Sequence, residues 1–298
     1  MTAKMPTEYL DNKIDLAPGR PYGAILGLSP SKGARSPVLW RAAFEALGIE
    51  ADFHPFDVSP DQLPNLIQAL SDDPRFIGGA CAVPYKEQLV SILHDIEPEA
   101  KDIGAINAFY RTSGGELKGA NTDGEGGLEA LRDLTPDLSG KIVLVMGLGG
   151  AGKALATYVA HAGAVLRVWN RTNSKAKACV QMLSVNGRTV SSVSSLNHAA
   201  LCDVDVLINC TSIGFSADGC ENEDIPCHPD VLDFLPESAI VYDIVYQPLK
   251  TQLLKAAEER GLKTLNGKSM NQKQAVIAFC KAVKQANPVI VEAAMINA

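Results

Sequence analysis

The feature that most constrains the fold is a glycine-rich turn within residues 141–172. Five consecutive apolar residues, Ile142 to Met146, predict a buried strand, and an apolar helical pattern follows to about Ala162. Val165 to Trp169 then predict a second strand. The turn after the first strand spaces its glycines as G-x-G-x-x-G. Between a strand and a helix, with a second strand following, this spacing predicts the phosphate-binding turn of a Rossmann-type domain.

Each glycine of this turn has its own physical role. Gly147 allows the tight turn, Gly149 lets the backbone approach a pyrophosphate, and Gly152 lets the helix pack closely on the strand. The N–H groups at the start of the helix then face the anion. We therefore expect Gly147, Gly149, Gly150 and Ala151 to bind a dinucleotide.

The residue that ends the second strand indicates which nicotinamide dinucleotide is bound. An acid there accepts a hydrogen bond from the ribose 2′-hydroxyl of NAD, whereas a nearby arginine accommodates the 2′-phosphate of NADP. This chain has Asn170, followed by Arg171, Thr172 and Lys175. We expect these four residues to bind the cofactor and to favour NADP over NAD. Two other interpretations stay open, because Thr172 also suits capping of the next helix and Arg171 also suits stacking on an adenine.

Two further apolar segments, residues 203–214 and 239–248, predict buried strands with polar ends. In a parallel sheet, ligands bind at the carboxyl ends of the strands. Tyr246 is therefore expected to lie along this crevice. The other residues expected to contact the cofactor there are Thr211, Ser212, Ile244 and Gly267.

The first half of the chain also alternates predicted strands and helices. Residues 22–28, 51–58 and 76–83 predict strands, with helices between them, and Ser59 is expected to cap the second helix. This order is typical of a parallel sheet. The fold class expected for the whole chain is therefore α/β, with an N-terminal α/β domain and a Rossmann-like, doubly wound parallel sheet.

Charge and composition disfavour several classes of partner. The net charge of −7 and the pI near 5.3 argue against nucleic acid and anionic membranes, which attract clustered Lys and Arg. No window reaches the ~18 apolar residues of a spanning helix, and the polar N-terminal stretch does not resemble a signal peptide. Seven cysteines without a C-x-x-C pair suit a reducing compartment, so we expect a cytoplasmic protein. The histidines lack metal-ligand spacing, so no metal is expected.

Together these segments resemble the shikimate dehydrogenase family from about residue 22 to residue 284. The motifs that carry the resemblance are VPYKE, GAINA, GANTDGEG, GLGGAGKA, NRTNSKA, NCTSIGF, DIVYQPLKTQLL and GKSMNQKQA. The resemblance implies a substrate-binding domain over residues 1–122, completed by 268–298, and an NAD(P)-binding domain over 123–267. It also implies reversible hydride transfer at a secondary alcohol of a small cyclic hydroxy acid such as shikimate or quinate. The sequence leaves open whether the protein is a monomer or a homodimer.

Lys86 and Asp123 match the family's catalytic pair. Removing hydride from a carbinol leaves an alkoxide-like oxygen, so a nearby group must accept its proton or stabilise its charge. Lysine does either, and an aspartate beside it holds the ammonium and shares the proton. An exposed lysine on a turn and a helix-capping aspartate are the alternative interpretations. The positions that match the family's substrate-side residues are Ser36, Asn107, Tyr246 and Gln274.

The chain departs from the family pattern at four positions. Where the family reads Asn-Val-Thr-x-Pro-x-Lys before the catalytic lysine, Ala80 and Ala82 replace the Asn and the Thr. Ala34 replaces the first serine of Ser-x-Ser-Pro, and Trp40 replaces a histidine. Each missing hydrogen-bond partner weakens binding of the usual substrate by about 1–3 kcal/mol.

We therefore expect a divergent paralogue with altered substrate recognition and weak activity on shikimate. Arg35 suits bidentate binding of a carboxylate in place of the lost serine, and a solvent-facing arginine is the alternative. A quinate- or aminoshikimate-type dehydrogenase is a second enzyme hypothesis. A redox sensor that binds a dinucleotide without turnover is the alternative of a different class, and retention of Lys86 and Asp123 weighs against it.

Overall fold

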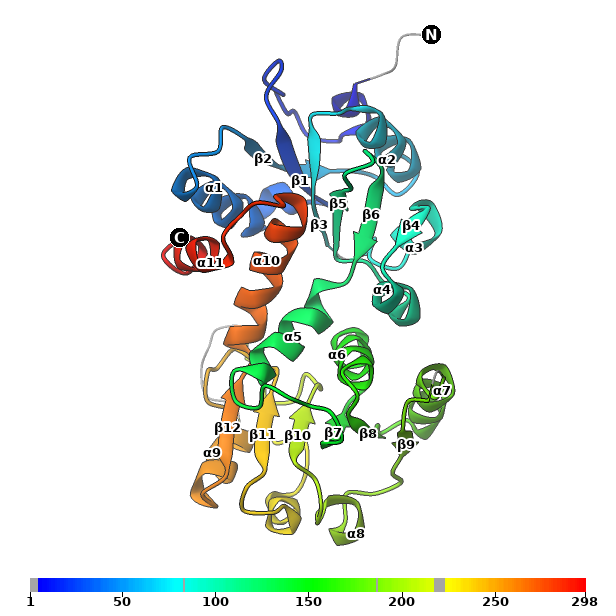
Figure 1. Ribbon diagram of the computed structural model, residues 1–298, viewed down its shortest axis with the longest axis vertical. Helices are drawn as coiled ribbons and strands as arrows, with labels where there is room; N and C mark the ends of the chain where they lie inside the picture. The colour runs from blue at the N-terminus through cyan, green and yellow to red at the C-terminus, as the bar shows by residue number, and fades with distance from the viewer. Residues whose placement is uncertain (1–4, 83, 186, 217–222) are drawn as a thin grey trace. The chain divides into compact units, whose positions relative to one another are not determined.

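The structure is a computed structural model that describes residues 5–82, 84–185, 187–216 and 223–298 (Figure 1). Contacts along the chain divide it into two compact units. The first comprises the residues up to Thr122 together with Gln274–Ala298, and the second comprises Asp123–Lys273. The second division thus falls inside helix α10 (Lys268–Ala282), whereas we expected it before this helix.

In the first unit, the described strands form one mixed sheet in the order β2-β1-β3-β5-β6-β4. The strands are β1 (Tyr22–Gly27), β2 (Asp52–Asp57), β3 (Phe76–Cys81), β4 (Asp95–Ile96), β5 (Ala108–Arg111) and β6 (Leu117–Ala120). β1 pairs in parallel with β2 and β3, as the strand–helix–strand order predicts. β5 is antiparallel to both β3 and β6, and its pairing with β6 follows from the short turn that joins these two strands.

Helices cover both faces of this sheet (Figure 1). They are α1 (Ser36–Ala46), α2 (Leu63–Asp72), α3 (Leu89–Ile92), α4 (Pro98–Ile103), α11 (Pro288–Ile296) and most of α10, with 3-10 turns η1 (Pro6–Tyr9) and η2 (Pro30–Lys32). Because successive side chains of a strand alternate, Ala24 and Leu26 of β1 face the core beneath α2. Ile25 faces the opposite core, which α1, α10 and α11 close.

β3 is shorter than the sequence predicted, and its glycines explain how it fits. It ends at Cys81, Ala82 lies after the strand, and Val83, the last residue of the predicted strand, lies outside the described residues. Gly79 is required because a Cβ there would lie 1.8 Å from the Ala24 carbonyl oxygen of β1. The close approach of these two strands brings the segment before Lys86 tightly against the sheet.

The predicted capping of α2 by Ser59 is wrong. The helix begins at Leu63, and the residues before it form a turn in which the Gln62 N–H donates to the Ser59 carbonyl oxygen at 3.0 Å. The Ser59 hydroxyl instead donates to the Asp11 carboxylate, which lies far away in sequence. A tertiary contact has therefore replaced the local cap.

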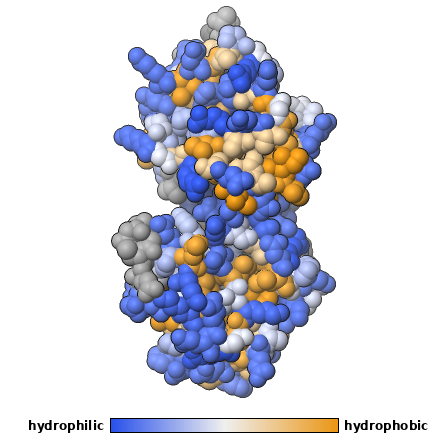
Figure 2. Space-filling view, turned by 90° about the vertical axis from the view of Figure 1, so that its left-hand side faces the viewer, coloured by the Kyte–Doolittle hydropathy of each residue, from blue (hydrophilic) through white to orange (hydrophobic). Residues whose placement is uncertain are grey.

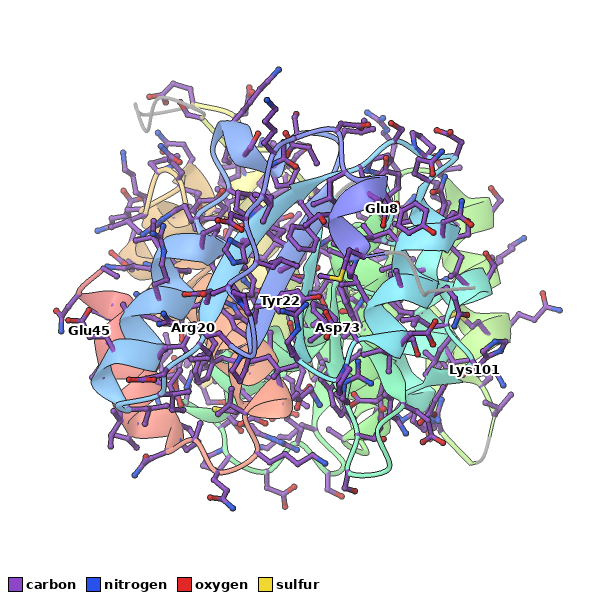
Figure 3. All side chains as sticks on the ribbon, turned by 90° about the horizontal axis from the view of Figure 1, so that it is seen from above. Glu8, Arg20, Tyr22, Glu45, Asp73 and Lys101 are labelled. Carbon is purple, nitrogen blue, oxygen red and sulfur yellow. The ribbon has the colours of Figure 1, made fainter. Side chains whose placement is uncertain are left out.

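At its other end, α2 leads into a polar cluster beside β1 (Figure 3). Asp73 accepts hydrogen bonds from the Tyr22 hydroxyl at 3.0 Å and from Arg75 Nη2 at 2.8 Å. Burial raises the pKa of Asp73, but the hydrogen bonds from Arg75 and Tyr22 outweigh it and hold the pKa below its ordinary value. The cluster joins the start of β1 to the turn between α2 and β3.

In the second unit, the described strands form one parallel sheet in the order β12-β11-β10-β7-β8-β9. The strands are β7 (Ile142–Met146), β8 (Val165–Trp169), β9 (Val190–Ser192), β10 (Val206–Asn209), β11 (Ile240–Asp243) and β12 (Lys263–Asn266). From β7 the chain adds β8 and β9 on one side of the sheet and then β10, β11 and β12 on the other side. The strand order therefore reverses between β7 and β10, as in doubly wound sheets. The predicted α/β fold class is confirmed.

The helices of the second unit close the faces of its sheet (Figure 1). They are α5 (Thr122–Arg132), α6 (Gly150–His161), α7 (Asn173–Leu183), α8 (His198–Leu201), α9 (Gln252–Glu259) and the start of α10, with the 3-10 helix η3 (Pro229–Phe234). α8, α9 and η3 pack against Leu144, Leu207 and Val241. Gly124 lets α5 approach α6, because a Cβ there would lie 2.6 Å from the Ala154 carbonyl oxygen.

Apolar side chains remain exposed on α11 and α1 (Figure 2). Val289, Ile290 and Ile296 of α11 and Val38 of α1 are between 42% and 73% exposed. Among the described residues, no helix combines the length and apolar character needed to cross a bilayer. The same part of the chain contains no group of three or more His, Cys, Asp and Glu side chains placed to bind a metal ion.

Candidate functional site

The turn after β7 has the backbone geometry that its glycines predict. Gly147 has a φ of +89°, and a Cβ there would lie 2.6 Å from Thr211 Cγ2. A Cβ at Gly152 would lie 2.0 Å from the Gly147 carbonyl oxygen, so α6 packs directly on the turn. By contrast, a Cβ at Gly149 or Gly150 would meet no protein atom within 4 Å. The backbone at Gly149 and Gly150 is thus accessible to a ligand.

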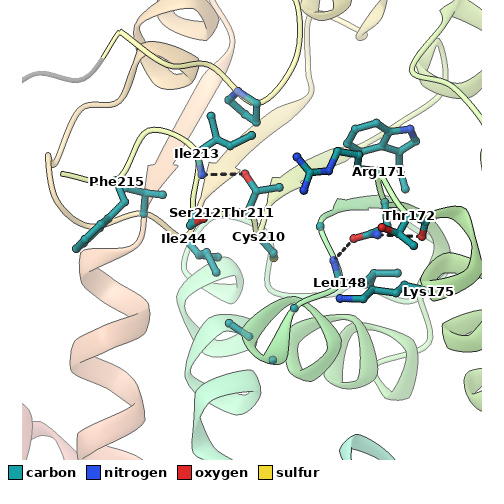
Figure 4. Close-up of a pocket in the computed structure, with 18 of the residues that line it drawn as sticks. Leu148, Arg171, Thr172, Lys175, Cys210, Thr211, Ser212, Ile213, Phe215 and Ile244 are labelled. Carbon is teal, nitrogen blue, oxygen red and sulfur yellow. Dashed lines mark hydrogen bonds between the residues drawn. The ribbon is translucent and has the colours of Figure 1, made fainter. Parts of the chain in front are cut away.

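A cleft of about 720 Å³ lies over this turn, at the carboxyl ends of β7, β8, β10 and β11 (Figure 4). Parallel sheets bind ligands at such a point, where the strand order reverses. Predicted residues that line it are Gly147, Gly149, Gly150, Ala151, Asn170, Arg171, Thr172, Lys175, Thr211, Ser212, Ile244 and Tyr246. The geometry brings the predicted dinucleotide residues together around one cleft.

Gly267 has a different environment from these residues. It is buried and is not among the residues that line the cleft. Its N–H donates to the Val245 carbonyl oxygen at 3.1 Å, and a Cβ there would lie 1.9 Å from the Ile244 carbonyl oxygen. Gly267 therefore allows the start of α10 to pack against the end of β11, and a cofactor contact of its own stays a prediction.

Asn170 ties the glycine turn to the end of β8. Its Oδ1 accepts from the Leu148 N–H at 2.9 Å, and its Nδ2 donates to the Thr172 carbonyl oxygen at 3.0 Å (Figure 4). An acid at this position would also accept from Leu148, but it has no N–H to donate. Asn170 thus fixes the turn while adding no negative charge to the cleft.

Beside Asn170 the cleft carries exposed polar and basic side chains. Arg171, Thr172 and Lys175 are all exposed, and the ion pairs formed within the described residues include neither Arg171 nor Lys175. Thr172 occupies the N-cap position of α7, but its side chain makes no capping hydrogen bond. Thr172 thus occupies the N-cap position that the sequence suggested, without a side-chain capping bond, and it lines the cleft together with the two cations. This arrangement suits a phosphate group.

On the β10–β11 side, residues that the sequence did not indicate contribute to the cleft. Ile213, Phe215 and Val245 line it, and the Phe215 ring packs on Tyr246 with ring centroids 6.0 Å apart. Phe215 and Tyr246 are 40% and 44% exposed. The NCTSIGF motif contains Ile213 and Phe215, but no pattern distinguished them from ordinary apolar residues of a strand end.

In the first unit, buried contacts on both sides hold the turn that carries Lys86. The preceding residue, Tyr85, is fully buried, and its hydroxyl donates to the Val58 carbonyl oxygen at 2.6 Å. The Lys86 carbonyl oxygen accepts from the Ile106 N–H at 2.7 Å. Lys86 itself is half-buried, so it differs from the fully exposed turn lysine of the alternative interpretation. Its backbone is fixed while the side chain extends from the turn.

Two of the predicted substrate-side residues are joined through Thr122. The Asn107 Oδ1 accepts from the Thr122 N–H at 2.6 Å, and the Asn107 Nδ2 donates to Thr122 Oγ1 at 3.1 Å. Thr122 Oγ1 in turn donates to Gln274 Oε1 at 3.4 Å. Sequence reasoning did not select Thr122, which is completely buried and begins α5.

Asp123 and Ser36 both lie in the first turn of a helix. Asp123 follows the first residue of α5 and is half-buried, so it lies inside the helix rather than at its N-cap. Ser36 is the first residue of α1, and Arg35 before it is exposed.

The four departures from the family pattern gather on one apolar cluster of the first unit. Trp40 is 1% exposed and packs against Phe53 and Phe279, with ring centroids 4.4 and 5.0 Å apart. Ala34, Ala80 and Ala82 are partly buried against the same cluster. The tryptophan therefore forms part of the core, and the three alanines present methyl groups where polar side chains were expected.

Comparisons with known proteins cover most of the chain. Residues 27–109 match the profile of the shikimate dehydrogenase substrate binding domain, and residues 129–215 match that of shikimate / quinate 5-dehydrogenase. The shikimate dehydrogenase (NADP(+)) of Symbiobacterium thermophilum is 35% identical over 88% of each chain.

Two solved structures with the same fold extend the comparison. Shikimate 5-dehydrogenase from Listeria monocytogenes, in complex with shikimate and NAD, has a TM-score of 0.81 at 26% identity and covers 95% of this chain and 98% of its own. Ligand-free 5-ketofructose reductase of Gluconobacter sp. strain CHM43 has a TM-score of 0.79 at 28% identity and covers 93% and 98%. With both family profiles matched, the chain belongs to the shikimate dehydrogenase family of oxidoreductases.

Proposed function

We propose that this protein is an NADP-dependent dehydrogenase that transfers hydride reversibly at a secondary alcohol of a small polyhydroxylated substrate. The observation that carries the proposal is the cleft over the glycine turn, with Arg171 and Lys175 exposed at the end of β8. Neither cation has a carboxylate to neutralise it within the described ion pairs. A 2′-phosphate placed there gains charge-assisted hydrogen bonds that a 2′-hydroxyl does not.

The proposed catalytic residues are Lys86 and Asp123. A dinucleotide held at the glycine turn would supply the hydride acceptor or donor. Lys86 takes the hydroxyl proton as the alcohol is oxidised and returns it during reduction. Asp123 is its proposed partner in proton transfer, and Asn107 and Gln274, joined through Thr122, are proposed to orient the substrate hydroxyls. Ser36 and Tyr246 complete the proposed substrate-side set.

The expected substrate is a cyclic hydroxy acid of the shikimate or quinate type. The Symbiobacterium relative, named for shikimate and NADP, supports this assignment. A second candidate is an uncharged keto sugar, and the methyl group of Ala34 favours it because it offers a carboxylate no hydrogen bond where the family has a serine. The structural likeness to 5-ketofructose reductase points to the same candidate.

A panel of substrates tests the function. Purified protein is assayed by NAD(P)H absorbance with NADP or NAD and with shikimate, quinate or fructose, and in the reverse direction with 5-ketofructose. We expect turnover with NADP, weak activity on shikimate, and higher activity on another member of the panel. The substitution Arg171→Ser should raise the KM for NADP by about tenfold and leave the KM for NAD unchanged, since it removes one phosphate contact.

The alternative outcomes are distinct. Rapid oxidation of micromolar shikimate would show that the replaced positions do not alter recognition. Dinucleotide binding without turnover on any compound of the panel would favour a redox sensor instead. An equal rise in KM for both dinucleotides in the Arg171 variant would contradict the assignment of Arg171 to the 2′-phosphate.

A further inference from the structure

One buried carboxylate lies beneath the cleft without lining it. Asp243 ends β11, is 0% exposed, and is not among the residues that line the cleft. It accepts hydrogen bonds from Asn209 Nδ2 at 2.9 Å, from Thr251 Oγ1 at 2.7 Å and from the Val245 N–H at 3.1 Å. The donors belong to β10, to the N-cap of α9 and to the segment after β11.

Asn209 links Asp243 to Thr211, a residue that lines the cleft. Because Asn209 Nδ2 donates to Asp243, the amide is oriented with its Oδ1 toward the following segment. This oxygen accepts from the Thr211 N–H at 3.0 Å and from the Thr211 hydroxyl at 2.8 Å. Thr211 Oγ1 then accepts from the Ile213 N–H at 3.2 Å (Figure 4). The chain of bonds fixes the backbone of residues 210–213.

The bond to Val245 fixes the second segment of the same wall. Ile244 and Tyr246, on either side of Val245, line the cleft, as do Thr211 and Ile213. Asp243 is thus bonded to one segment directly and to the other through Asn209. Adenosine is expected at the β8 end and the pyrophosphate at the glycine turn, so this wall faces the nicotinamide half of a dinucleotide.

Burying an ionised carboxylate at this position costs free energy unless its oxygens accept hydrogen bonds. Burial raises the pKa of Asp243 to about 6, although the hydrogen bonds from Thr251, Val245 and Asn209 lower it. The other titratable groups that act on this region are Cys210 and Tyr242, whose pKa values burial also raises. The described ion pairs include no cation bonded to Asp243, so hydrogen-bond donors alone satisfy it.

We infer that Asp243 is a positioning residue for dinucleotide binding, which it serves by holding residues 210–213 and 244–246 in the wall of the cleft. The inference rests on the proposed function. It assigns no contact with the cofactor to Asp243 itself. A side chain that keeps the acceptor oxygen toward Asn209 and Val245 should therefore keep the wall in place, and one without an acceptor should not.

Binding of NADP⁺ to the full-length protein tests the inference without depending on the substrate. Asp243→Ala should raise the Kd by about tenfold or more, as expected from losing a charge-assisted hydrogen bond. Asp243→Asn keeps one acceptor oxygen and should stay within about threefold of the wild type. In the alanine variant the KM for NADP should rise several times more than the KM for the alcohol, because only Tyr246 of this wall belongs to the proposed substrate-side set. General destabilisation would not separate the two constants.

Thr157→Val is the matched control. Thr157 is also 0% exposed in the second unit, but its hydroxyl donates to the Lys153 carbonyl oxygen within α6. This variant should lower the Tm and leave the Kd unchanged. If Asp243→Ala does not fold, Asn209→Ala, which removes the link between Asp243 and the Thr211 segment, should raise the Kd by about tenfold.

The inference is overturned if Asp243→Ala, or Asn209→Ala in its place, binds NADP⁺ like the wild type. It is also overturned if Asp243→Asn loses as much affinity as Asp243→Ala, since charge rather than hydrogen bonding would then be responsible. Failure of the proposed function has a different signature, because the wild-type protein itself would then not bind NADP⁺ or not transfer hydride.

Discussion

At the scale of single residues, burial and hydrogen bonding act in opposite directions on the Asp243 carboxyl group. Burial raises its pKa from 3.8 to about 6, while Thr251, Val245 and Asn209 lower it by donating hydrogen bonds. Because the folded pKa exceeds the unfolded one, the unfolded chain releases this proton first as the pH rises. The contribution of Asp243 to the free energy of unfolding therefore falls by ~3 kcal/mol between about pH 4 and pH 6 and changes no further above that range.

An amide at position 243 does not titrate, so it should remove this pH dependence. We predict that the free energy of unfolding of Asp243→Asn, minus that of the wild type, increases by about 3 kcal/mol between pH 4 and pH 7. Urea unfolding of both proteins across this range measures the difference. A difference that does not change with pH would show that Asp243 titrates near its ordinary pKa.

The network around Asp243 was not predictable from the sequence. Asp243 and Asn209 each end a buried strand, and a polar strand end indicates only the edge of the sheet. Their mutual hydrogen bond joins residues 34 positions apart. The glycine turn, in contrast, was predictable because each of its glycines is needed for a steric reason that the local sequence pattern shows. Contacts distant in sequence leave no comparable local pattern.

At the scale of elements, the end of α2 depends on an arginine from another part of the sheet. The last carbonyl groups of a helix have no partners within the helix. Arg111 of β5 donates to the carbonyl oxygens of Leu70, Ser71 and Asp73 at 2.7, 3.1 and 2.9 Å, and Arg111 Nε donates to that of Phe76 at 2.7 Å. One guanidinium thus caps α2 and joins it to β3 and β5.

We predict that Arg111→Met lowers the free energy of unfolding by about 3 kcal/mol, because several buried carbonyl groups lose a charged donor. Arg132→Met is the matched control, since Arg132 is 42% exposed and its one ion pair within the described part of the chain is with Glu129 on α5. It should cost less than about 0.5 kcal/mol. Equal effects of the two substitutions in urea unfolding would show that the cap contributes no more than a surface charge.

Secondary-structure elements were predicted best where the pattern and the packing agree. The segments β7, α6 and β8 match their predicted ranges closely, since a continuous apolar run, a glycine turn and a helical period all specify them. Ser59 failed as a cap because Asp11, distant in sequence, bonds its hydroxyl. Trp40 was interpreted as a lost polar partner, but it packs among aromatic residues of the core.

At the scale of the whole molecule, the proposed reaction draws on both units. Lys86 belongs to the first unit, and the glycine turn and the basic end of β8 belong to the second. Each unit has its own sheet and its own core. The sequence predicted these two sheets from the alternation of elements, and the family resemblance predicted the return of the C-terminal helices to the first unit. The substrate was less predictable, because the positions at which this chain departs from the family are among those expected to contact it.

The turnover of a Lys86→Met variant, measured with the best substrate of the panel, tests the central claim most directly. Methionine approximates the length of the lysine side chain but carries no proton. We predict a fall in kcat of about a thousandfold, within the range for loss of a general acid–base group, with the Kd for NADP⁺ unchanged. A variant that keeps more than about a tenth of the wild-type kcat would contradict the assignment of Lys86 to proton transfer.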